Sequence, residues 1–249
     1  MIRSDLHVHT TFSDGVNTPE EVVLEAIRRG METVGFSDHA YTPCDTSYCM
    51  QKSAQKAYFD TITALKEKYK GQITVKCGIE RDVFFGEDDN VYDYAIGAAH
   101  YLCFGTEYVP VDLSADALRK AADGYYGGDM YAVAEKYYKT VESVIDKTNA
   151  DVIGHFDLIA KFNEKERLFD EKHPRYVQAW QKAADKLLAS GKVFEINTGA
   201  IARGYRTMPY PSQEIYAYLK AHGARFILSS DSHKKETLMF GFERYETLI

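Results

Sequence analysis

The sequence lacks the features of several classes of protein. Its four cysteines form no Cys-x-x-Cys pair among 249 residues, so we expect reduced thiols buried in the core instead of disulfides or a thiolate metal site. The longest nearly apolar stretch, residues 94–104, is too short to cross a membrane, and we expect no membrane partner. The first residues resemble no leader peptide, which predicts a cytoplasmic protein.

An excess of positive charge is also missing. Thirty Lys and Arg against 37 Asp and Glu give a formal net charge of −7. Proteins that bind long nucleic acids need a basic surface to neutralise phosphates, so we exclude that partner. A small anion held in a local positive site stays open. Residue composition is ordinary, with 45% hydrophobic residues, and no linker-like run interrupts the chain, which predicts one domain over residues 1–249.

Short apolar strands alternate with amphipathic helices along the chain. The predicted strands cover residues 2–9, 33–37, 73–80, 94–100, 152–155, 192–197 and 225–230. A helix is predicted after the capping sequence at Thr18, and others over residues 53–69, 114–122, 131–146, 174–190 and 212–222. Seven strands alternating with helices predict a parallel α/β sheet, either open or closed into a barrel.

Side chains able to bind metal ions gather at the carboxyl ends of these strands. They are His7, His9, Asp38, His39, Glu80, His100, His155, Asn197, Asp231 and His233. A barrel brings such ends together at one mouth, whereas an open sheet spreads them along an edge. One strand-end histidine is usually a hydrogen-bonded core residue, but six of the eight histidines stand at such positions. Imidazole and carboxylate donors suit zinc, manganese or iron.

The order of these motifs resembles the polymerase and histidinol phosphatase (PHP) superfamily. The resemblance is carried by Asp5-x-His7-x-His9, Ser37-Asp38-His39, Glu80, His100, Gly154-His155-x-Asp157 and Asp231-x-His233. Residues 195–199, followed by Arg203 and the turn at 210–212, are similar to the histidinol-phosphatase branch. The resemblance implies a distorted (βα)7 barrel with a metal site at the carboxyl ends of its strands.

The resemblance also implies three divalent metal ions, with zinc as the first expectation and manganese or iron as alternatives. The first ion is assigned to His7, His9, Glu80 and Asp231. Glu80 would bridge to a second ion on His100 and His155, and a third would bind Asp14, His39 and His233. Some members of the superfamily have a histidine near the position of Asp14, where this chain has none. Behind the ligands we expect the carboxylates of Asp5, Asp38 and Asp157.

Metal chemistry and the resemblance together predict hydrolysis of a phosphomonoester. Paired divalent ions activate a bridging water near neutral pH, and basic side chains neutralise the phosphoryl oxygens. The predicted catalytic residues are Glu80, Arg203, Asp231 and His233, and the predicted substrate contacts are Lys161, Asn197, Arg203 and Arg206.

The first expectation for the reaction is the conversion of L-histidinol phosphate and water to L-histidinol and phosphate, a step of histidine biosynthesis. The acidic residues 87–89 could attract the substrate amine, although we favour a solvated loop. The alternatives are a PHP phosphoesterase acting on another small phosphorylated metabolite or nucleotide, and a non-catalytic metal-binding module.

Overall fold

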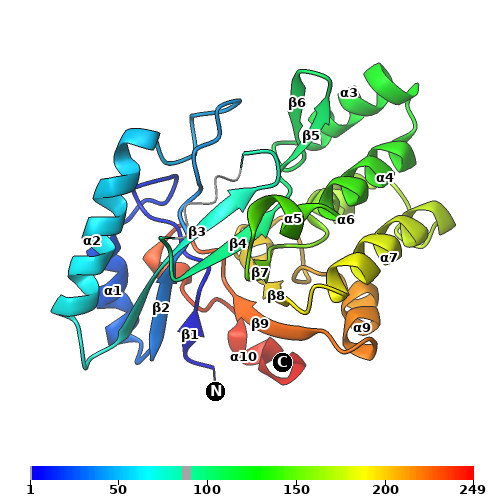
Figure 1. The fold of residues 1–249 in the computed structure, drawn as a ribbon. Helices are drawn as coiled ribbons and strands as arrows, with labels where there is room; N and C mark the ends of the chain where they lie inside the picture. Colours follow the sequence, from blue (N-terminus) through cyan, green and yellow to red (C-terminus); the bar gives the residue numbers. More distant parts are fainter. Residues whose placement is uncertain (1, 86–90) are drawn as a thin grey trace.

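Seven parallel strands form a nearly closed barrel in the computed structural model, which describes residues 2–85 and 91–249 (Figure 1). The order around the sheet is β1-β2-β3-β4-β7-β8-β9. These strands are β1 (Ser4–Asp5), β2 (Thr33–Phe36), β3 (Thr74–Asp82), β4 (Tyr94–Ala98), β7 (Val152–Ile153), β8 (Val193–Asn197) and β9 (Arg225–Ser229). All paired neighbours in this sheet run parallel. The predicted α/β barrel is confirmed.

The seam between the first and the last strand lies beyond the ends of both. Val8 and Ser232 form a single parallel bridge. The His9 amide donates to the Ser232 carbonyl at 2.8 Å, and the Ser232 amide donates to the His7 carbonyl at 3.0 Å. The prediction of one strand over residues 2–9 is therefore wrong in length, because β1 ends at Asp5 and the two histidines follow it.

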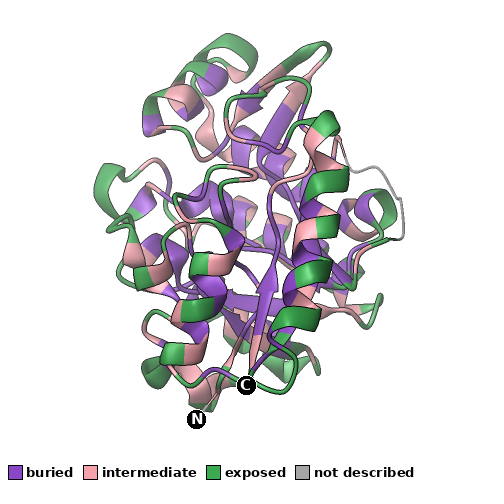
Figure 2. Ribbon diagram, turned by 90° about the vertical axis from the view of Figure 1, so that its left-hand side faces the viewer, coloured by how far each residue is buried: buried purple, intermediate pink, exposed green. Residues whose placement is uncertain are grey.

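Helices surround the barrel and bury their apolar sides against it (Figures 1 and 2). They are α1 (Pro19–Arg28), α2 (Gln55–Lys68), α3 (Ala115–Tyr126), α4 (Met130–Val141), α5 (Val144–Thr148), α6 (Asn163–Glu166), α7 (Pro174–Leu188), α8 (Gly199–Ala202), α9 (Gln213–Ala221) and α10 (Phe242–Tyr245). The first begins as predicted, with Thr18 and Glu21 exchanging the hydrogen bonds of a capping box. The single helix expected over 131–146 is two helices, interrupted where the Ser143 hydroxyl bonds the Thr140 carbonyl.

A small apolar cluster fills the barrel beneath the strand ends. Tyr94, Ile96 and Val152 form its buried part. The Tyr94 hydroxyl donates to the Leu6 carbonyl at 2.5 Å, directly before the first histidine of the chain. Gly78 leaves room for this ring, because a Cβ there would lie 2.3 Å from Tyr94 Cζ. The packed interior of the barrel thus provides a rigid base for the side chains at the carboxyl ends of its strands.

A hairpin that was not predicted follows β4. Strands β5 (Tyr101–Phe104) and β6 (Glu107–Pro110) pair antiparallel and project from the carboxyl end of the barrel (Figure 1). The nearly apolar run of residues 94–104 contains both β4 and β5, and the tight turn that follows it includes Gly105 at φ +66°. The hairpin carries the chain over the barrel mouth and back to Asp112, which lines the cavity described below.

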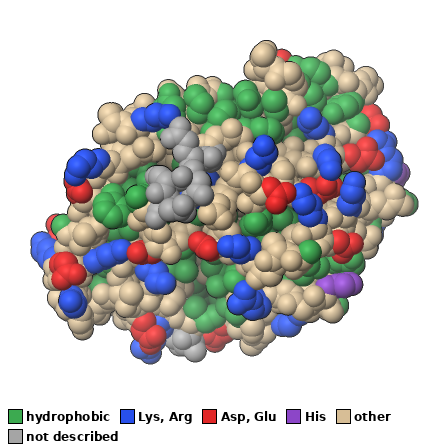
Figure 3. Space-filling model, viewed as in Figure 1, with side chains coloured by type: hydrophobic (Ala, Val, Ile, Leu, Met, Phe, Trp, Pro, Cys, Tyr) green, Lys and Arg blue, Asp and Glu red, His purple; other side chains and the backbone are tan. Residues whose placement is uncertain are grey.

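Other expectations have mixed outcomes. All four cysteines are free thiols, but only Cys49 and Cys77 are buried, so the prediction of burial is wrong for the exposed Cys44. Within residues 2–85 and 91–249, no helix combines the length and the apolarity needed to cross a bilayer. The acidic residues 87–89 lie outside the described part of the chain. On the face shown in Figure 3, basic and acidic side chains are interleaved.

Candidate metal centre

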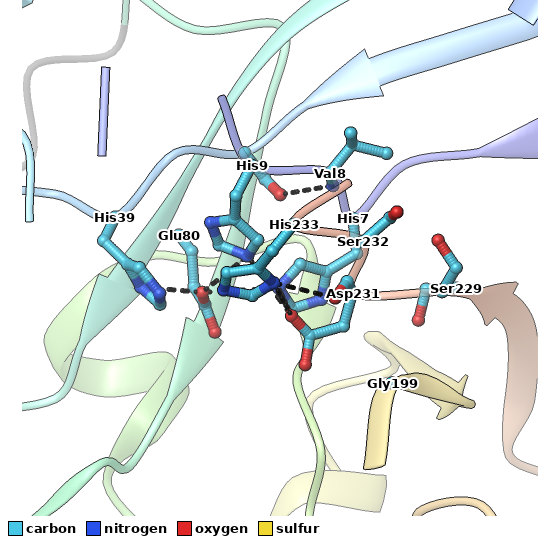
Figure 4. Close-up of polar contacts among 12 residues, drawn as sticks. His7, Val8, His9, His39, Glu80, Gly199, Ser229, Asp231, Ser232 and His233 are labelled. Carbon is cyan, nitrogen blue, oxygen red and sulfur yellow. Dashed lines mark hydrogen bonds and ion pairs between the residues drawn. The ribbon is translucent and has the colours of Figure 1, made fainter. Parts of the chain in front are cut away.

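Nine side chains with nitrogen or oxygen donors meet at the carboxyl ends of the strands. They are His7, His9, Asp14, His39, Glu80, His100, His155, Asp231 and His233. Figure 4 labels His7, His9, His39, Glu80, Asp231 and His233 among them. The nine come from the segments that follow β1, β2, β4, β7 and β9 and from the last part of β3. We call this set the metal centre. Its members coincide with the ligands expected from the sequence.

Glu80 stands in the middle of the metal centre and faces histidines with both of its carboxylate oxygens, and His9 Nε2 lies 3.6 Å from Oε2. Its Oε2 lies 2.9 Å from His39 Nδ1 and 3.3 Å from His7 Nε2. Its Oε1 lies 3.0 Å from His155 Nε2 and 3.3 Å from His100 Nε2. A carboxylate whose two oxygens face different imidazoles has the arrangement needed to bridge two ions.

A further group of donors forms around Asp14. One carboxylate oxygen lies 3.8 Å from His39 Nε2 and 3.9 Å from His9 Nδ1, and the other lies 3.2 Å from His233 Nε2. The ligand atoms of these four residues all lie within 4.8 Å of one another. Asp14 therefore stands where a ligand of the third ion was expected, although its carboxylate replaces a histidine found in some superfamily members.

Buried donor atoms without partners test whether metal ions fit this set. Among the described residues, His7 Nε2, His9 Nε2 and Glu80 Oε2 are buried and have no hydrogen-bond partner. Leaving one such atom unsatisfied costs about 1–3 kcal/mol. A cation that accepts their lone pairs removes this cost, and a donor set of imidazole and carboxylate suits zinc, manganese or iron. The residues fit the implied ions.

The electrostatics of the metal centre hold its carboxylates ionised. Burial opposes charge on Glu80, but His7 and His39 outweigh it and hold the pKa of Glu80 well below its usual value. Burial also opposes charge on His7, yet Glu195 and the other carboxylates raise the pKa of His7 well above its usual value. Burial, aided by the imidazoles of His233 and His39, lowers the pKa of His9 to about 3. An ion that binds here must displace protons from some rings.

Glu195 is a functional residue that sequence reasoning missed. Its Oε2 lies 2.8 Å from His7 Nδ1 and accepts from the Ser229 hydroxyl. Its Oε1 accepts from the His155 amide at 2.5 Å and from Asn197 Nδ2 at 2.9 Å. The available signal was the Glu-x-Asn spacing in β8, which points both side chains to the barrel interior. Glu195 orients His7 and leaves the other ring nitrogen for a metal ion.

Asn197 was predicted to contact substrate, and the structure places it behind the metal centre instead. Its side chain is fully buried, and its amide nitrogen lies 2.9 Å from Glu195 Oε1 and 3.4 Å from Asp231 Oδ2. Its side-chain oxygen accepts from the Gly199 amide at 2.9 Å. Asn197 therefore connects two acidic side chains and the turn that follows β8.

The three carboxylates expected behind the ligands bind backbone amides, hydroxyl groups and, for Asp157, a guanidinium group. Asp5 accepts from the amide and hydroxyl of Ser230. Asp38 accepts from the amide and hydroxyl of Thr10 at 2.8 and 2.9 Å and so shapes the loop that carries Asp14. Asp5 lies behind the ligands as expected, but its hydrogen bond to His7 comes from the backbone amide, at 3.4 Å, and not from the ring.

Asp157, the third of these carboxylates, pairs with a residue that was predicted to bind phosphate. Its Oδ2 lies 3.3 Å from Arg206 Nη1 and accepts from the Ser212 amide at 3.0 Å. The Arg206 side chain is 3% exposed and lies against the Tyr210 ring at 4.6 Å. Arg206 is not among the residues that line the cavity. Its guanidinium thus faces the protein interior, away from an incoming phosphate.

A cavity of about 430 Å³ opens above the metal centre. Besides several metal-centre residues, it is lined by a set that we call the cavity wall: Tyr48, Tyr101, Asp112, Lys161, Arg203 and Tyr205. Lys161 Nζ donates to the Asp112 carbonyl at 2.8 Å and lies 4.7 Å from the centre of the Tyr205 ring. Of the three predicted phosphate-binding cations, Lys161 and Arg203 reach the cavity.

A protein-family profile and several known proteins are similar to this chain. The family profile described as "PHP domain" matches residues 5–199. A Schizosaccharomyces pombe protein named "Probable histidinol-phosphatase" is 27% identical over 235 residues, which cover 86% of this chain and 74% of that protein. The histidinol-phosphatase of Bacillus subtilis is 23% identical over 98% of both chains.

Solved structures share the barrel. The protein HisK of Listeria monocytogenes superposes with a TM-score of 0.81 at 20% identity, covering 97% of this chain and 99% of that one. The histidinol phosphate phosphatase of Lactococcus lactis, solved with zinc, L-histidinol and phosphate, gives a TM-score of 0.75 at 22% identity over 99% and 92% of the two chains. At these identities the likeness establishes the fold.

Proposed function

Because the chain belongs to the PHP domain family, we propose that it is a metal-dependent phosphomonoesterase whose substrate is L-histidinol phosphate. The observation that carries this proposal is the convergence of nine metal-binding side chains at the base of one cavity. The choice of substrate is supported by the relatives named as histidinol-phosphatases. The reaction would yield L-histidinol and phosphate in histidine biosynthesis.

We propose that the metal centre holds three divalent ions, with zinc as the first candidate. The first ion would bind His7, His9, Glu80 and Asp231, the second Glu80, His100 and His155, and the third Asp14, His39 and His233. The close groups formed by His7, His9 and Asp231 and by Asp14, His39 and His233 support the first and third ions. The second is supported by Glu80 Oε1, which faces both His100 and His155, and the zinc found in the Lactococcus lactis enzyme supports the choice of metal. When bound, the ions would supply an activated water and neutralise charge on the phosphoryl group.

The residues of the cavity wall would bind and orient the substrate. Lys161 and Arg203 provide positive charge for the phosphoryl oxygens. The rings of Tyr101 and Tyr205 offer apolar faces for an imidazole, and Asp112 offers a carboxylate for the substrate ammonium group. The cavity volume of about 430 Å³ is in the range of small-molecule sites.

The charged side chains of the metal centre would act mainly through the fixed positions of their charges. Glu80, Asp231 and His233 are proposed as catalytic residues through their position at the metal ions. The pKa of Asp231 lies well below its usual value because Arg203 and the neighbouring imidazoles outweigh the effect of its burial. It would therefore remain an anionic ligand throughout the reaction. A cytoplasmic location is proposed as well, which the four free thiols support.

The proposal is tested by phosphate release from a panel of monoesters with purified, metal-analysed protein. We expect kcat/KM for L-histidinol phosphate to exceed that for an aryl phosphate by about 100-fold or more, since the wall would recognise both the ring and the amine. Equal turnover of both would overturn the substrate and leave another phosphoesterase activity. No release from any ester by the zinc-loaded protein would overturn the enzymatic function itself.

A further inference from the structure

The two carboxylate oxygens of Asp231 face different partners. Oδ1 lies 3.3 Å from His9 Nε2 and 3.8 Å from His7 Nε2, toward the metal centre. Oδ2 accepts a hydrogen bond from Arg203 Nη2 at 2.8 Å. The other terminal nitrogen of Arg203 donates to the carbonyl of the same aspartate, also at 2.8 Å. One arginine thus holds both the side chain and the backbone of this ligand.

The backbone of Asp231 needs such support. Its φ of +48° lies in the left-handed region, which is uncommon for residues other than glycine. Residues in this region persist where surrounding contacts fix them, and they concentrate at functional sites. The hydrogen bond from Arg203 to the Asp231 carbonyl is one such contact. The position of the carboxylate is therefore set by tertiary interactions and not by local preference.

Gly199 makes the contact between Arg203 and Asp231 possible. It opens the short helix α8, beside Asp231 in Figure 4. A Cβ placed on Gly199 would lie 2.8 Å from Arg203 Nη2, 2.8 Å from Asp231 Cβ and 2.9 Å from Asp231 Oδ2. Its φ is outside the left-handed region, so the backbone conformation suits any residue. The reason for glycine here is space.

We propose that Gly199 and Arg203 are positioning residues for Asp231. Gly199 leaves the slot in which Arg203 binds Oδ2, and this contact makes Asp231 present Oδ1 alone to the metal centre. A charge-assisted hydrogen bond is strong enough to fix a carboxylate in this way. Arg203 then has a role that does not need substrate. The inference rests on the proposed metal centre but not on the identity of the phosphate ester.

The test measures zinc affinity without substrate. Metal-free protein is titrated with zinc in competition with a chromophoric chelator. Loss of a contact that orients a metal ligand lowers affinity by about 10- to 100-fold, and we expect this loss in both Gly199→Ala and Arg203→Ala, for one ion of the set. Arg203→Ala keeps the proposal testable if the alanine at 199 prevents folding. Unchanged zinc affinity in Arg203→Ala would overturn the proposal.

A double-mutant cycle separates positioning from independent packing effects. If both residues act on the position of the same carboxylate, the double variant should lose less zinc affinity than the product of the two single losses. Fully additive losses would overturn the proposal. So would a Gly199→Ala variant that melts at a lower temperature but binds zinc normally, because the glycine would then serve packing alone.

A matched glycine controls for the substitution itself. Gly124 lies inside α3, and a Cβ built there would meet no heavy atom within 4 Å. Gly124→Ala should leave zinc affinity unchanged. If the wild-type protein fails to hydrolyse L-histidinol phosphate while the zinc affinities change as expected, the proposed function fails and the positioning role stands.

Discussion

The metal centre and the cavity wall occupy the same end of the barrel but are built from different parts of the chain. The metal centre stands on the strand ends, and His7, His9, Glu80 and His155 are each at most 3% exposed. The wall comes from the loops beyond them: the β5–β6 hairpin leads to Asp112, and the turns after β7 and β8 carry the basic residues. A rigid frame thus fixes the metal-binding chemistry, while loops shape what enters.

The largest expected effect breaks the metal centre at its middle. In Glu80→Gln one oxygen and its charge are lost from a residue that faces histidines with both oxygens, so we expect loss of at least one bound ion and a fall in phosphate release of about 1,000-fold or more. Metal analysis and steady-state kinetics measure both. Glu243→Gln, on the exposed helix α10, is the matched control. Retained metal and activity in Glu80→Gln would contradict the central role of this carboxylate.

The next effect concerns Arg206, which the sequence analysis predicted as a substrate contact. In Arg206→Met the buried carboxylate of Asp157 loses its partner, and breaking a buried ion pair costs about 3–5 kcal/mol. We expect a clear loss of stability in chemical denaturation, with the affinity of the folded protein for inorganic phosphate unchanged. Weaker phosphate binding without a loss of stability would show instead that Arg206 binds phosphate.

Metal binding should depend on pH with a defined sign. The pKa of His7 and of His100 lies well above 6.5 in the metal-free protein, against the effect of burial, because carboxylates surround both rings. Because a raised pKa holds the proton on these rings to a higher pH than on a free imidazole, zinc must displace protons, and affinity should fall about tenfold per pH unit for each proton displaced as pH decreases. Calorimetry in two buffers with different protonation enthalpies counts the protons. Binding without proton release at pH 7 would contradict this electrostatic arrangement.

The same pKa shifts predict that the stability of the metal-free protein decreases as pH rises, which is the opposite of the trend predicted for zinc affinity. A folded-state pKa above the unfolded value of 6.5 means that the stabilising contribution of a charged imidazole is complete below pH 6.5. It is lost as pH rises through the raised pKa. The metal-free protein should therefore melt at a lower temperature as pH rises above neutrality, whereas zinc-loaded protein should not.

The smallest expected effect lies on the wall. Lys161→Met removes a cation that lines the cavity. Within residues 2–85 and 91–249, the ammonium group of Lys161 hydrogen-bonds Asp112 and none of the nine donors. We expect the inhibition constant of inorganic phosphate to rise about tenfold, the loss typical of one charged hydrogen bond. Zinc content should remain that of the wild type. If zinc is lost as well, the wall and the metal centre are not separate parts of the site.

This division also explains what could be predicted from the sequence. Strand ends are found from short apolar runs, and in a parallel barrel all of them converge, so histidines at those positions predict a common site without any distance information. The ligand histidines, Glu80 and Asp231 were accessible in this way. Asp14 needed the family resemblance, because nothing in its local pattern distinguishes it from a turn residue.

The rest depended on partners that are distant in the sequence. Arg203 and Arg206 follow the same strand and look alike in the sequence, yet one faces the cavity and the other faces Asp157, which lies 49 positions earlier. Glu195 sits in a quoted motif, but its contact with His7 spans 188 positions. The hairpin after β4 was missed because β4 and β5 share the nearly apolar run of residues 94–104, and such a run does not reveal where one strand ends and the next begins.

The seam between β1 and β9 gives the metal centre an order of assembly. Asp5 and Ser230, whose contact lies at this seam, are 225 positions apart, and Asp231 and His233 are encoded just beyond. A growing chain that has not yet passed this point holds only seven of the nine donors, with the barrel still open. Synthesis must therefore pass residue 233 before the full set of ligands exists. Any ions bound across this seam would link the segment after β1 to the segment after β9 and so stabilise the closed barrel.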